Sequence, residues 1–228
     1  EVRVVAVGDM FFDRYIRQVA DLRGEDFLFS CTKELFKEGD LVVGNLEGPI
    51  TTESSRSINT LIGSPENYVF TFPTTTASML KRNGVTAVSL GNNHITNFGV
   101  DGLNTTRKYL NDSGVGGFGG IAGDEPVYRV RIKNIPIAFI SYNQFGGQSV
   151  HDVAQQIKVE RLTGNVVIVY AHWGDEYSTS VSYTRPIAQI FADAGANAII
   201  GSHPHIVLPY EYIGSTLVYY SLGNFIFD

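Results

Sequence analysis

Ala198-Ile199-Ile200-Gly201-Ser202-His203-Pro204-His205 is the stretch from which the fold and the site of this chain can be worked out. It begins as a β-branched run typical of a buried strand and ends in two histidines, one residue apart, with a rigid proline between them. Two imidazoles held in this way can face one metal ion. The stretch therefore predicts a strand that carries metal ligands at its end.

Four other apolar runs end in polar residues in the same way. Val4 to Val7 is followed by Gly8-Asp9, and Leu41 to Val43 is followed by Asn45-Leu46-Glu47. Ala87 to Leu90 is followed by Gly91-Asn92-Asn93-His94, and Val166 to Ala171 is followed by His172-Trp173-Gly174. In open α/β sheets, ligands gather beyond the carboxyl ends of the strands. We therefore expect the five strand ends to converge on one site.

The composition bounds the class of protein. A chain of 228 residues, 43% of them apolar, can bury a sizeable core, and we expect a single domain over residues 1–228. A net charge of -6 without any Lys/Arg run argues against nucleic acid as a partner. Cys31 is the only cysteine, which excludes an internal disulfide and a thiolate zinc cluster. No apolar run approaches the roughly 20 residues of a spanning helix, so we expect no membrane insertion by this chain itself.

Strand-length apolar runs alternate with stretches of helical period, as in βαβ units. The helical stretches are Phe27, Leu28, Cys31, Leu35 and Phe36 on one face; Ala77, Leu80 and Lys81, ended by Asn83-Gly84; Val100 to Leu110, followed by a turn over 111–117; and Ile187, Ile190, Phe191 and Ala194. Two hairpins are expected, over 127–132 with 137–141 and over 210–212 with 216–220. This mixture predicts a layered α/β/β/α sandwich, with helices outside and mixed sheets within.

Residues 50–71 form the longest segment without a clear period. The segment directly follows Glu47, so it is either a lid or substrate-recognition loop or a plain surface excursion, and the sequence favours neither. The stretch 114–119 satisfies Gly-x-Gly-x-x-Gly, but it follows a helix instead of opening one, so we interpret it as a turn and not as a dinucleotide site.

Six residues at the strand ends offer carboxylate, amide oxygen and imidazole donors: Asp9, Glu47, Asn93, His172, His203 and His205. This set suits Mn, Fe or Zn, and one carboxylate can bridge two such ions roughly 3.5 to 4 Å apart. Each residue alone has a simpler interpretation. Asp9 is expected to cap a helix over 15–22, Asn45 and Glu47 to satisfy loop backbone, Asn92-Asn93 to form a turn, and His172 to be a hydrogen-bonded core histidine. Their joint placement at strand ends favours the metal site.

The same motifs carry a family resemblance. They are Gly8-Asp9-Met10-Phe11-Phe12-Asp13-Arg14, Asn45-Leu46-Glu47-Gly48-Pro49-Ile50-Thr51, Val88-Ser89-Leu90-Gly91-Asn92-Asn93-His94, His172-Trp173-Gly174-Asp175-Glu176-Tyr177, Gly201-Ser202-His203-Pro204-His205, and Tyr220-Ser221-Leu222-Gly223-Asn224-Phe225-Ile226-Phe227-Asp228. In this order, from Val4 to Asp228, they resemble the CapA family of bacterial poly-γ-glutamate capsule biosynthesis proteins. That resemblance implies a calcineurin-like metallophosphoesterase fold.

The resemblance also implies roles for single residues. Asp9 and His205 hold one metal, Glu47 is the bridging carboxylate, and Asn93, His172 and His203 hold the other metal. His94 matches a position whose imidazole stabilises the transferred phosphoryl group or protonates the leaving oxygen, which suits a group with a pKa near neutrality. Arg14, Glu176 and Arg185 are expected near the substrate. For Arg14 the alternative is a surface ion pair, and for Arg185 we favour that alternative.

Three departures from the family pattern bear on function. Phe11 stands where the broader superfamily has a histidine two residues after the first aspartate, so one metal loses an imidazole. Asn97 stands where family members often have an acidic residue, which lowers the basicity of His94 if the two interact. Family members commonly have an amino-terminal membrane anchor, which is missing from this chain; because it begins at Glu1, we expect a further segment before it.

Two functions from different classes follow. The favoured one is a metal-dependent hydrolase that activates water for attack on a phosphoester, acting in synthesis, export or anchoring of poly-γ-glutamate at the bacterial cell surface or the extracytoplasmic side of the membrane. Its substrate is either a phosphoester or an anionic polymer. The alternative is a noncatalytic accessory subunit of a membrane-bound poly-γ-glutamate synthase, which the Phe11 departure favours and the Asn93-His94 pair disfavours.

Overall fold

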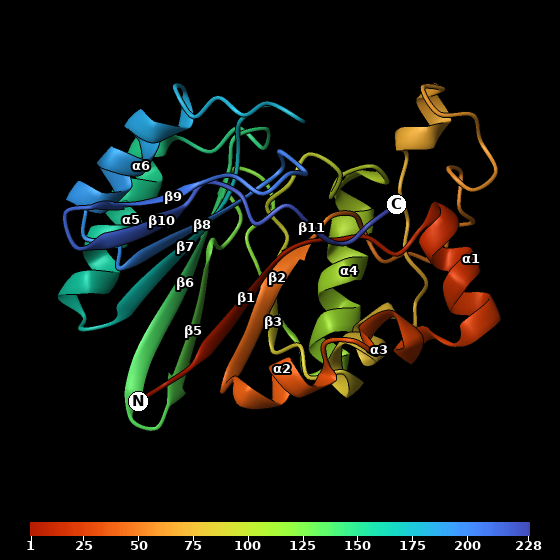
Figure 1. Ribbon diagram of the computed structural model, residues 1–228, viewed down its shortest axis with the longest axis horizontal. Helices are drawn as coiled ribbons and strands as arrows, with labels where there is room; N and C mark the ends of the chain where they lie inside the picture. Colours follow the sequence, from red (N-terminus) through yellow and green to blue (C-terminus); the bar gives the residue numbers. More distant parts are fainter.

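The computed structural model describes all of residues 1–228, and it places two β-sheets face to face between two layers of helices (Figure 1). This confirms the expected layered α/β/β/α architecture. Helices α5 and α6 cover one outer face, and α1 to α4 lie on the other side of the molecule. None of the helices has both the length and the apolar composition needed to cross a bilayer.

The first sheet has the strand order β11-β1-β2-β3-β4, and every neighbouring pair in it is parallel. Its strands are β1 (Val4–Met10), β2 (Leu41–Leu46), β3 (Ala87–Ser89), β4 (Gly116–Phe118) and β11 (Asn224–Ile226). The helical segments that accompany it are α1 (Arg14–Arg23), η1 (Glu25–Phe29), α2 (Lys33–Glu38), η2 (Pro65–Tyr68), α3 (Thr76–Arg82) and α4 (Gly99–Ser113), where η marks a 3₁₀ helix.

The second sheet has the order β5-β6-β7-β8-β10-β9 and is mixed, with antiparallel pairs at its two edges and parallel pairs between them. Its strands are β5 (Val127–Ile132), β6 (Ile135–Asn143), β7 (Val166–His172), β8 (Ala198–Ser202), β9 (Tyr210–Ile213) and β10 (Thr216–Tyr219). Helices α5 (Val150–Leu162) and α6 (Thr184–Asp193) pack on it. The two edge pairs are the two predicted hairpins, which are confirmed.

The two sheets share an apolar layer that includes Val43, Phe118, Phe139 and Tyr170. The buried Tyr170 hydroxyl donates a 2.6 Å hydrogen bond to the Val43 carbonyl across this layer. Strands covered on both faces are apolar along their whole length, which is why the central strands appear in the sequence as unbroken apolar runs. The layer fixes the two sheets relative to each other, and with them the ends of their strands.

The single helical face expected over residues 27–36 is wrong. The segment is a 3₁₀ helix and a short α-helix joined by a turn, and Cys31 is exposed. Phe29 and Phe36 are the buried residues, whereas Leu35 points to solvent. The Thr32 hydroxyl donates to the Phe29 carbonyl and helps to end the first helix, so the i, i+4 spacing is not maintained through the turn.

The turn expected over 111–117 is also wrong in its extent. Helix α4 continues to Ser113, Gly114 ends it with a φ of 68°, and Gly116 already belongs to strand β4. A Cβ on Gly116 would lie 2.6 Å from the Tyr128 ring, so glycine serves here for close packing within a strand. Asp9 does not cap a helix, because it lies within β1 and Asp13 precedes α1.

Candidate metal centre

The five polar strand ends meet, as expected, at the carboxyl edge of the two sheets. Asp9 is near the end of β1, Glu47 follows β2 and Asn93 follows β3, so the first sheet supplies the oxygen donors. His172 ends β7, and His203 and His205 follow β8, so the second sheet supplies three imidazoles. The backbone N–H of His203 donates to Asp9 Oδ2 at 3.2 Å, which ties the two groups together.

The chain crosses from the second sheet to the first directly beside this site. Its segment between β10 and β11 passes the glycines that precede Asp9 and His203 by one and two residues. A Cβ on Gly8 would lie 1.8 Å from the Gly223 carbonyl oxygen, and one on Gly201 would lie 2.0 Å from the Tyr220 carbonyl oxygen. Only glycine allows this approach, which explains the first residue of the Gly-Asp and Gly-Ser-His motifs.

Two carboxylates lie side by side at the centre of the site, and neither forms an ion pair with a lysine or arginine. Asp9 and Glu47 are both fully buried. The Asn45 amide donates to Asp9 Oδ1 at 2.8 Å and to Glu47 Oε2 at 3.4 Å, and the His203 N–H donates to Asp9 Oδ2. Glu47 Oε1 has no hydrogen-bond partner. Burial raises the pKa of Asp9, and burial together with the neighbouring Asp9 raises the pKa of Glu47 well above its usual range. Such a pair fits a divalent cation, which would supply the missing positive charge.

Three imidazoles surround this carboxylate pair. His205 Nε2 lies 3.6 Å and His172 Nε2 4.0 Å from Glu47 Oε1, and His205 Nδ1 lies 3.5 Å from Asp9 Oδ2. Ligand atoms of Glu47, His203 and His205 lie within 4.8 Å of one another, and so do those of Asp9, Glu47 and His172. Glu47 belongs to both groups, as a bridging carboxylate would. The division of the donors between two ions, with Asn93 beside His172 Nε2 at 2.9 Å, stays a prediction.

Two of these imidazoles are held in their neutral form. Burial lowers the pKa of His172 well below its usual range and lowers the pKa of His203 to about 3, with nearby histidines adding to both effects. His203 Nδ1 is buried without a hydrogen-bond partner. Neutral imidazole is the form that binds metals, so no proton has to be displaced from these two rings near neutral pH.

His203 and His205 both have left-handed backbone, with φ of 94° and 59°. Non-glycine residues adopt this conformation at a cost of about 1–3 kcal/mol and keep it only where the surroundings fix it. Here the β8 strand end, the intervening proline and the Asp9 contact fix it. This strained backbone allows the His203 and His205 rings, two residues apart in sequence, to lie near the same carboxylate, Glu47.

Several residues that orient the predicted ligands were not predicted from the sequence. Asn92 donates to Asn45 Oδ1 at 3.1 Å, the Ser202 hydroxyl lies 2.9 Å from His172 Nδ1, and Asn224 Oδ1 lies 2.8 Å from His205 Nδ1. The Phe145 ring packs 4.4 Å from the His203 ring. Hydrogen bonds of this kind set which nitrogen of a histidine faces a metal. Asn224 comes from β11, which the sequence did not predict.

His94 is positioned by Asn97. Asn97 Oδ1 accepts the Phe70 N–H at 2.8 Å, which identifies it as the oxygen, and it lies 3.1 Å from His94 Nδ1. His94 Nδ1 must therefore carry the proton, leaving Nε2 as the proton acceptor. Burial lowers the pKa of His94 to about 4, and the bond to Asn97 offsets only part of this. The interaction between His94 and Asn97 considered from the sequence is present in the structure.

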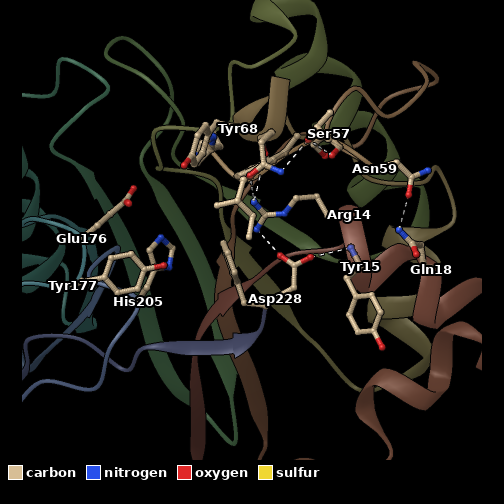
Figure 2. Close-up of a pocket in the computed structure, with 16 residues that line it drawn as sticks. Arg14, Tyr15, Gln18, Ser57, Asn59, Tyr68, Glu176, Tyr177, His205 and Asp228 are labelled. Atoms are coloured by element: carbon tan, nitrogen blue, oxygen red, sulfur yellow. Dashed lines mark hydrogen bonds and ion pairs between the residues drawn. The ribbon is translucent and has the colours of Figure 1, made fainter. Parts of the chain in front are cut away.

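A cavity of about 580 Å³ opens at His205, one of the predicted metal ligands (Figure 2). His94 and His205 line it, and side chains from residues 57–70 of the irregular segment form part of its wall. The base of that segment is fixed, because Asp13 Oδ2 accepts from the Ser57 hydroxyl at 2.9 Å and from the Thr71 N–H at 3.0 Å. Of the two interpretations left open, the structure favours a wall of the site over a plain surface excursion.

The remaining predicted residues lie at different distances from the site. Arg14 and Glu176 both line the cavity, and Arg14 is paired with Asp228. Arg185 does not line it; its Nε lies 3.0 Å from the Glu211 carboxylate on the surface, which is the alternative we favoured. Phe11 is fully buried and its ring lies 4.7 Å from those of Phe70 and Phe227, so an aromatic cluster occupies the place of the missing imidazole.

The fold and these donors define a layered α/β/β/α protein with a candidate metal centre between its sheets. Two solved structures, both from Thermus thermophilus, share the fold. A hypothetical protein matches with a TM-score of 0.61 and 16% identity, over 97% of this chain and 76% of that chain. The sulfate thiohydrolase SoxB matches with a TM-score of 0.51 and 11% identity, over 93% of this chain and 41% of that chain.

A family model described as "Bacterial capsule synthesis protein PGA_cap" matches residues 3–228, and the chain belongs to this family. It is 28% identical to the "PGA biosynthesis protein CapA" of Bacillus subtilis (strain 168), over 97% of this chain and 62% of that protein. It is 25% identical to the "Capsule biosynthesis protein CapA" of Bacillus anthracis, over 100% of this chain and 60% of that protein. The chain thus spans about three fifths of the length of these relatives, and membership of the CapA family is confirmed.

Proposed function

We propose that this chain is a metal-dependent hydrolase domain that cleaves a phosphoester in the biosynthesis of a poly-γ-glutamate capsule. The observation that carries the proposal is the pair Asp9 and Glu47, two buried carboxylates that no lysine or arginine pairs with, facing three imidazoles. A structural role does not require an acceptor such as His94 beside this pair. The family and the names of its Bacillus relatives support the link to capsule biosynthesis.

The donor set fits two divalent transition-metal ions, Mn, Fe or Zn, held by Asp9, Glu47, Asn93, His172, His203 and His205. Such ions supply positive charge to phosphoryl oxygens and lower the pKa of bound water. The protein's own groups do the rest. Neutral His94 lines the cavity, and Asn97 holds its ring in the tautomer that leaves Nε2 as a proton acceptor. Arg14 stays paired with Asp228 and shapes the cavity wall beside them.

The proposed place of action is the bacterial cell surface or the extracytoplasmic side of the membrane, with membrane synthase subunits as partners. The capsule biosynthesis named for the Bacillus relatives supports the placement, and the partners rest on the family resemblance alone. A noncatalytic accessory subunit of such a synthase is the second candidate, and the aromatic cluster at Phe11 is the observation that favours it. The two candidates differ in whether the site must bind metal and turn over a substrate.

The first test measures metal content by elemental analysis, on protein purified without chelator or added metal. We expect about two transition-metal equivalents per chain, lost in a His203→Ala/His205→Ala variant. Folded protein that cannot be loaded with Mn or Zn contradicts the hydrolase and supports the accessory subunit.

A second variant pair tests the reaction itself with a phosphodiester and metal-loaded protein. His94→Ala is expected to keep fold and metal but to lose roughly 100-fold or more in kcat, as positioned proton acceptors contribute. His151→Ala, an exposed histidine of α5, is the matched control and leaves kcat unchanged. Hydrolysis by His94→Ala at the wild-type rate removes His94 from the mechanism.

A further inference from the structure

Part of the cavity lining beyond His94 and His205 suits an uncharged ligand. Three exposed tyrosines, Tyr15, Tyr68 and Tyr177, stand around it and come from three different segments (Figure 2). None of their hydroxyls has a hydrogen-bond partner in the protein. Each ring offers an apolar face, and each hydroxyl offers a free donor and acceptor at its edge.

The cavity is also lined by amide and hydroxyl side chains with unused hydrogen-bonding capacity. Gln18 Nε2 donates to Asn59 Oδ1 at 3.4 Å, which leaves Gln18 Oε1 and Asn59 Nδ2 free (Figure 2). Asn67 and Thr60 are bonded to each other at 2.9 Å and support the wall. The wall thus combines flat apolar faces with neutral donors and acceptors.

The charges of the lining disfavour a polyanion. Arg14 is the only lysine or arginine side chain in the lining, and Asp228 and the Asn67 side chain already bind its guanidinium. Its guanidinium carbon also lies 4.7 Å from the centre of the Phe11 ring. Glu176, exposed at the cavity edge, adds a negative charge without a partner. A chain bearing one carboxylate per residue therefore finds no free lysine or arginine in this lining.

We propose that this cavity binds a sugar ring, and that the substrate of the site is therefore a glycosyl phosphate, with the phosphate facing His94 and His205 and the ring among Tyr15, Tyr68 and Tyr177. This inference rests on the proposed hydrolase function for its phosphate end and on the lining alone for its sugar end. A pyranose has an apolar C–H face that packs on an aromatic ring and hydroxyls that need neutral partners. A cavity of about 580 Å³ is within the size range of small-molecule sites, roughly 300–1,000 Å³.

The sugar end is tested first, by binding alone. Saturation-transfer NMR with methyl α-D-glucopyranoside is measured on metal-free protein, beside adenosine and a hexamer of γ-linked glutamate. We expect transfer to the glucoside that is lost in Tyr177→Ala and reduced in Tyr15→Ala. Tyr212→Ala is the matched control, because Tyr212 is 64% exposed, Tyr177 67%, and Tyr212 lies on β9 outside the cavity. Absence of transfer to the glucoside, equal transfer in all variants, or stronger transfer to adenosine or to the glutamate hexamer overturns the inference.

The phosphate end is tested by hydrolysis with metal-loaded protein. We expect kcat/KM for α-D-glucose 1-phosphate to exceed that for glycerol 3-phosphate, and Tyr177→Ala to lower this ratio about tenfold while Tyr212→Ala leaves it unchanged. An unchanged ratio in Tyr177→Ala overturns the inference even if both esters are cleaved. If neither ester is cleaved but the glucoside signal depends on Tyr177, the hydrolase proposal fails and the sugar site stands.

Discussion

The two sheets make different contributions to the same site. The all-parallel sheet brings Asp9, Glu47 and Asn93, whose donors are oxygens, and the mixed sheet brings His172 and the two histidines after β8, whose donors are nitrogens. Neither sheet carries a full set of ligands. A metal ion bound between them would link two layers that otherwise meet through apolar packing and a few hydrogen bonds.

The two sets of donors also affect the stability of the metal-free protein differently. On the parallel sheet, Asp9 and Glu47 repel each other and lose hydration. On the mixed sheet, His172 and His203 are neutral and pack on each other, with their rings 4.8 Å apart. The carboxylate side is thus destabilising without metal and the imidazole side is stabilising. Substitutions on the two sheets should therefore change metal binding and the free energy of unfolding in different ways.

The largest expected effect is the loss of metal from either side. Glu47→Gln on the parallel sheet and His172→Ala on the mixed sheet should each weaken metal binding by more than about 100-fold, since even residues that only orient ligands contribute 10–100-fold. Metal content after dialysis and hydrolysis of a phosphodiester are the two readouts. A variant of one sheet that keeps both metal and activity shows that the site is confined to the other sheet.

The same two variants should differ in sign when metal is absent. In chelator, Glu47→Gln is expected to raise the free energy of unfolding by about 1–2 kcal/mol, because it removes a buried charge beside Asp9. His172→Ala is expected to lower it by about 2–4 kcal/mol, because it leaves a cavity and unpaired partners at Ser202 and Asn93. Urea unfolding in chelator measures both changes, and equal signs contradict the asymmetry.

The gain in Glu47→Gln should depend on pH. A carboxyl whose pKa is raised by folding contributes stability below its unfolded pKa of about 4.3, and this stability is lost as pH rises toward the folded pKa. Glutamine does not titrate, so the difference between the variant and the wild type is expected to be small near pH 4 and to grow toward pH 8. A constant difference over this range shows that the effect of the substitution is steric.

A smaller effect is expected from restoring the missing imidazole. Phe11 is packed against Phe70 and Phe227 with the Arg14 guanidinium over its ring, so histidine there is a buried polar group next to a cation. We expect Phe11→His to lower the free energy of unfolding by about 2 kcal/mol without adding metal. Phe11→Leu is the control for the loss of the ring. A gain of one metal equivalent in Phe11→His means that the cluster can open to admit a ligand.

Strand ends were the predictable part of this molecule. Parallel strands covered on both faces are apolar runs, and the polar residues that stop them show where the site lies, so Asp9, Glu47 and His172 could be placed from sequence. Helix α5 could not, because its buried face includes Glu160, which Arg129, Gln156 and Asn165 satisfy. A charged residue on the inner face breaks the apolar period on which the prediction depends.

The convergence of the predicted ligands could be inferred from sequence, but the residues that orient them could not. Strand β11 has three residues and pairs with β1 across more than two hundred residues of sequence, so no local pattern reveals it or Asn224. The pairing of Asn97 with His94 is local, three residues apart, and could be considered from sequence. The fixing of residues 50–71 by Asp13 depends on contacts between distant segments, and this decided that the segment is a wall of the cavity.

The smallest effect is expected at Arg185, on the outer helix of the mixed sheet. Its side chain is 51% exposed and pairs with Glu211, a geometry that contributes less than about 0.5 kcal/mol when solvent screens it. Arg14, whose side chain is 17% exposed, is bound by Asp228 and covered by aromatic rings beside the parallel sheet. Arg185→Ala should therefore leave the Tm and the rate of phosphodiester hydrolysis unchanged. Arg14→Ala should lower both, because the cavity wall loses the contacts of Arg14 with Asp228 and the Phe11 ring. If Arg185→Ala lowers kcat, the substrate extends beyond the cavity to α6, and the mixed sheet then contributes to substrate binding as well as to the metal site.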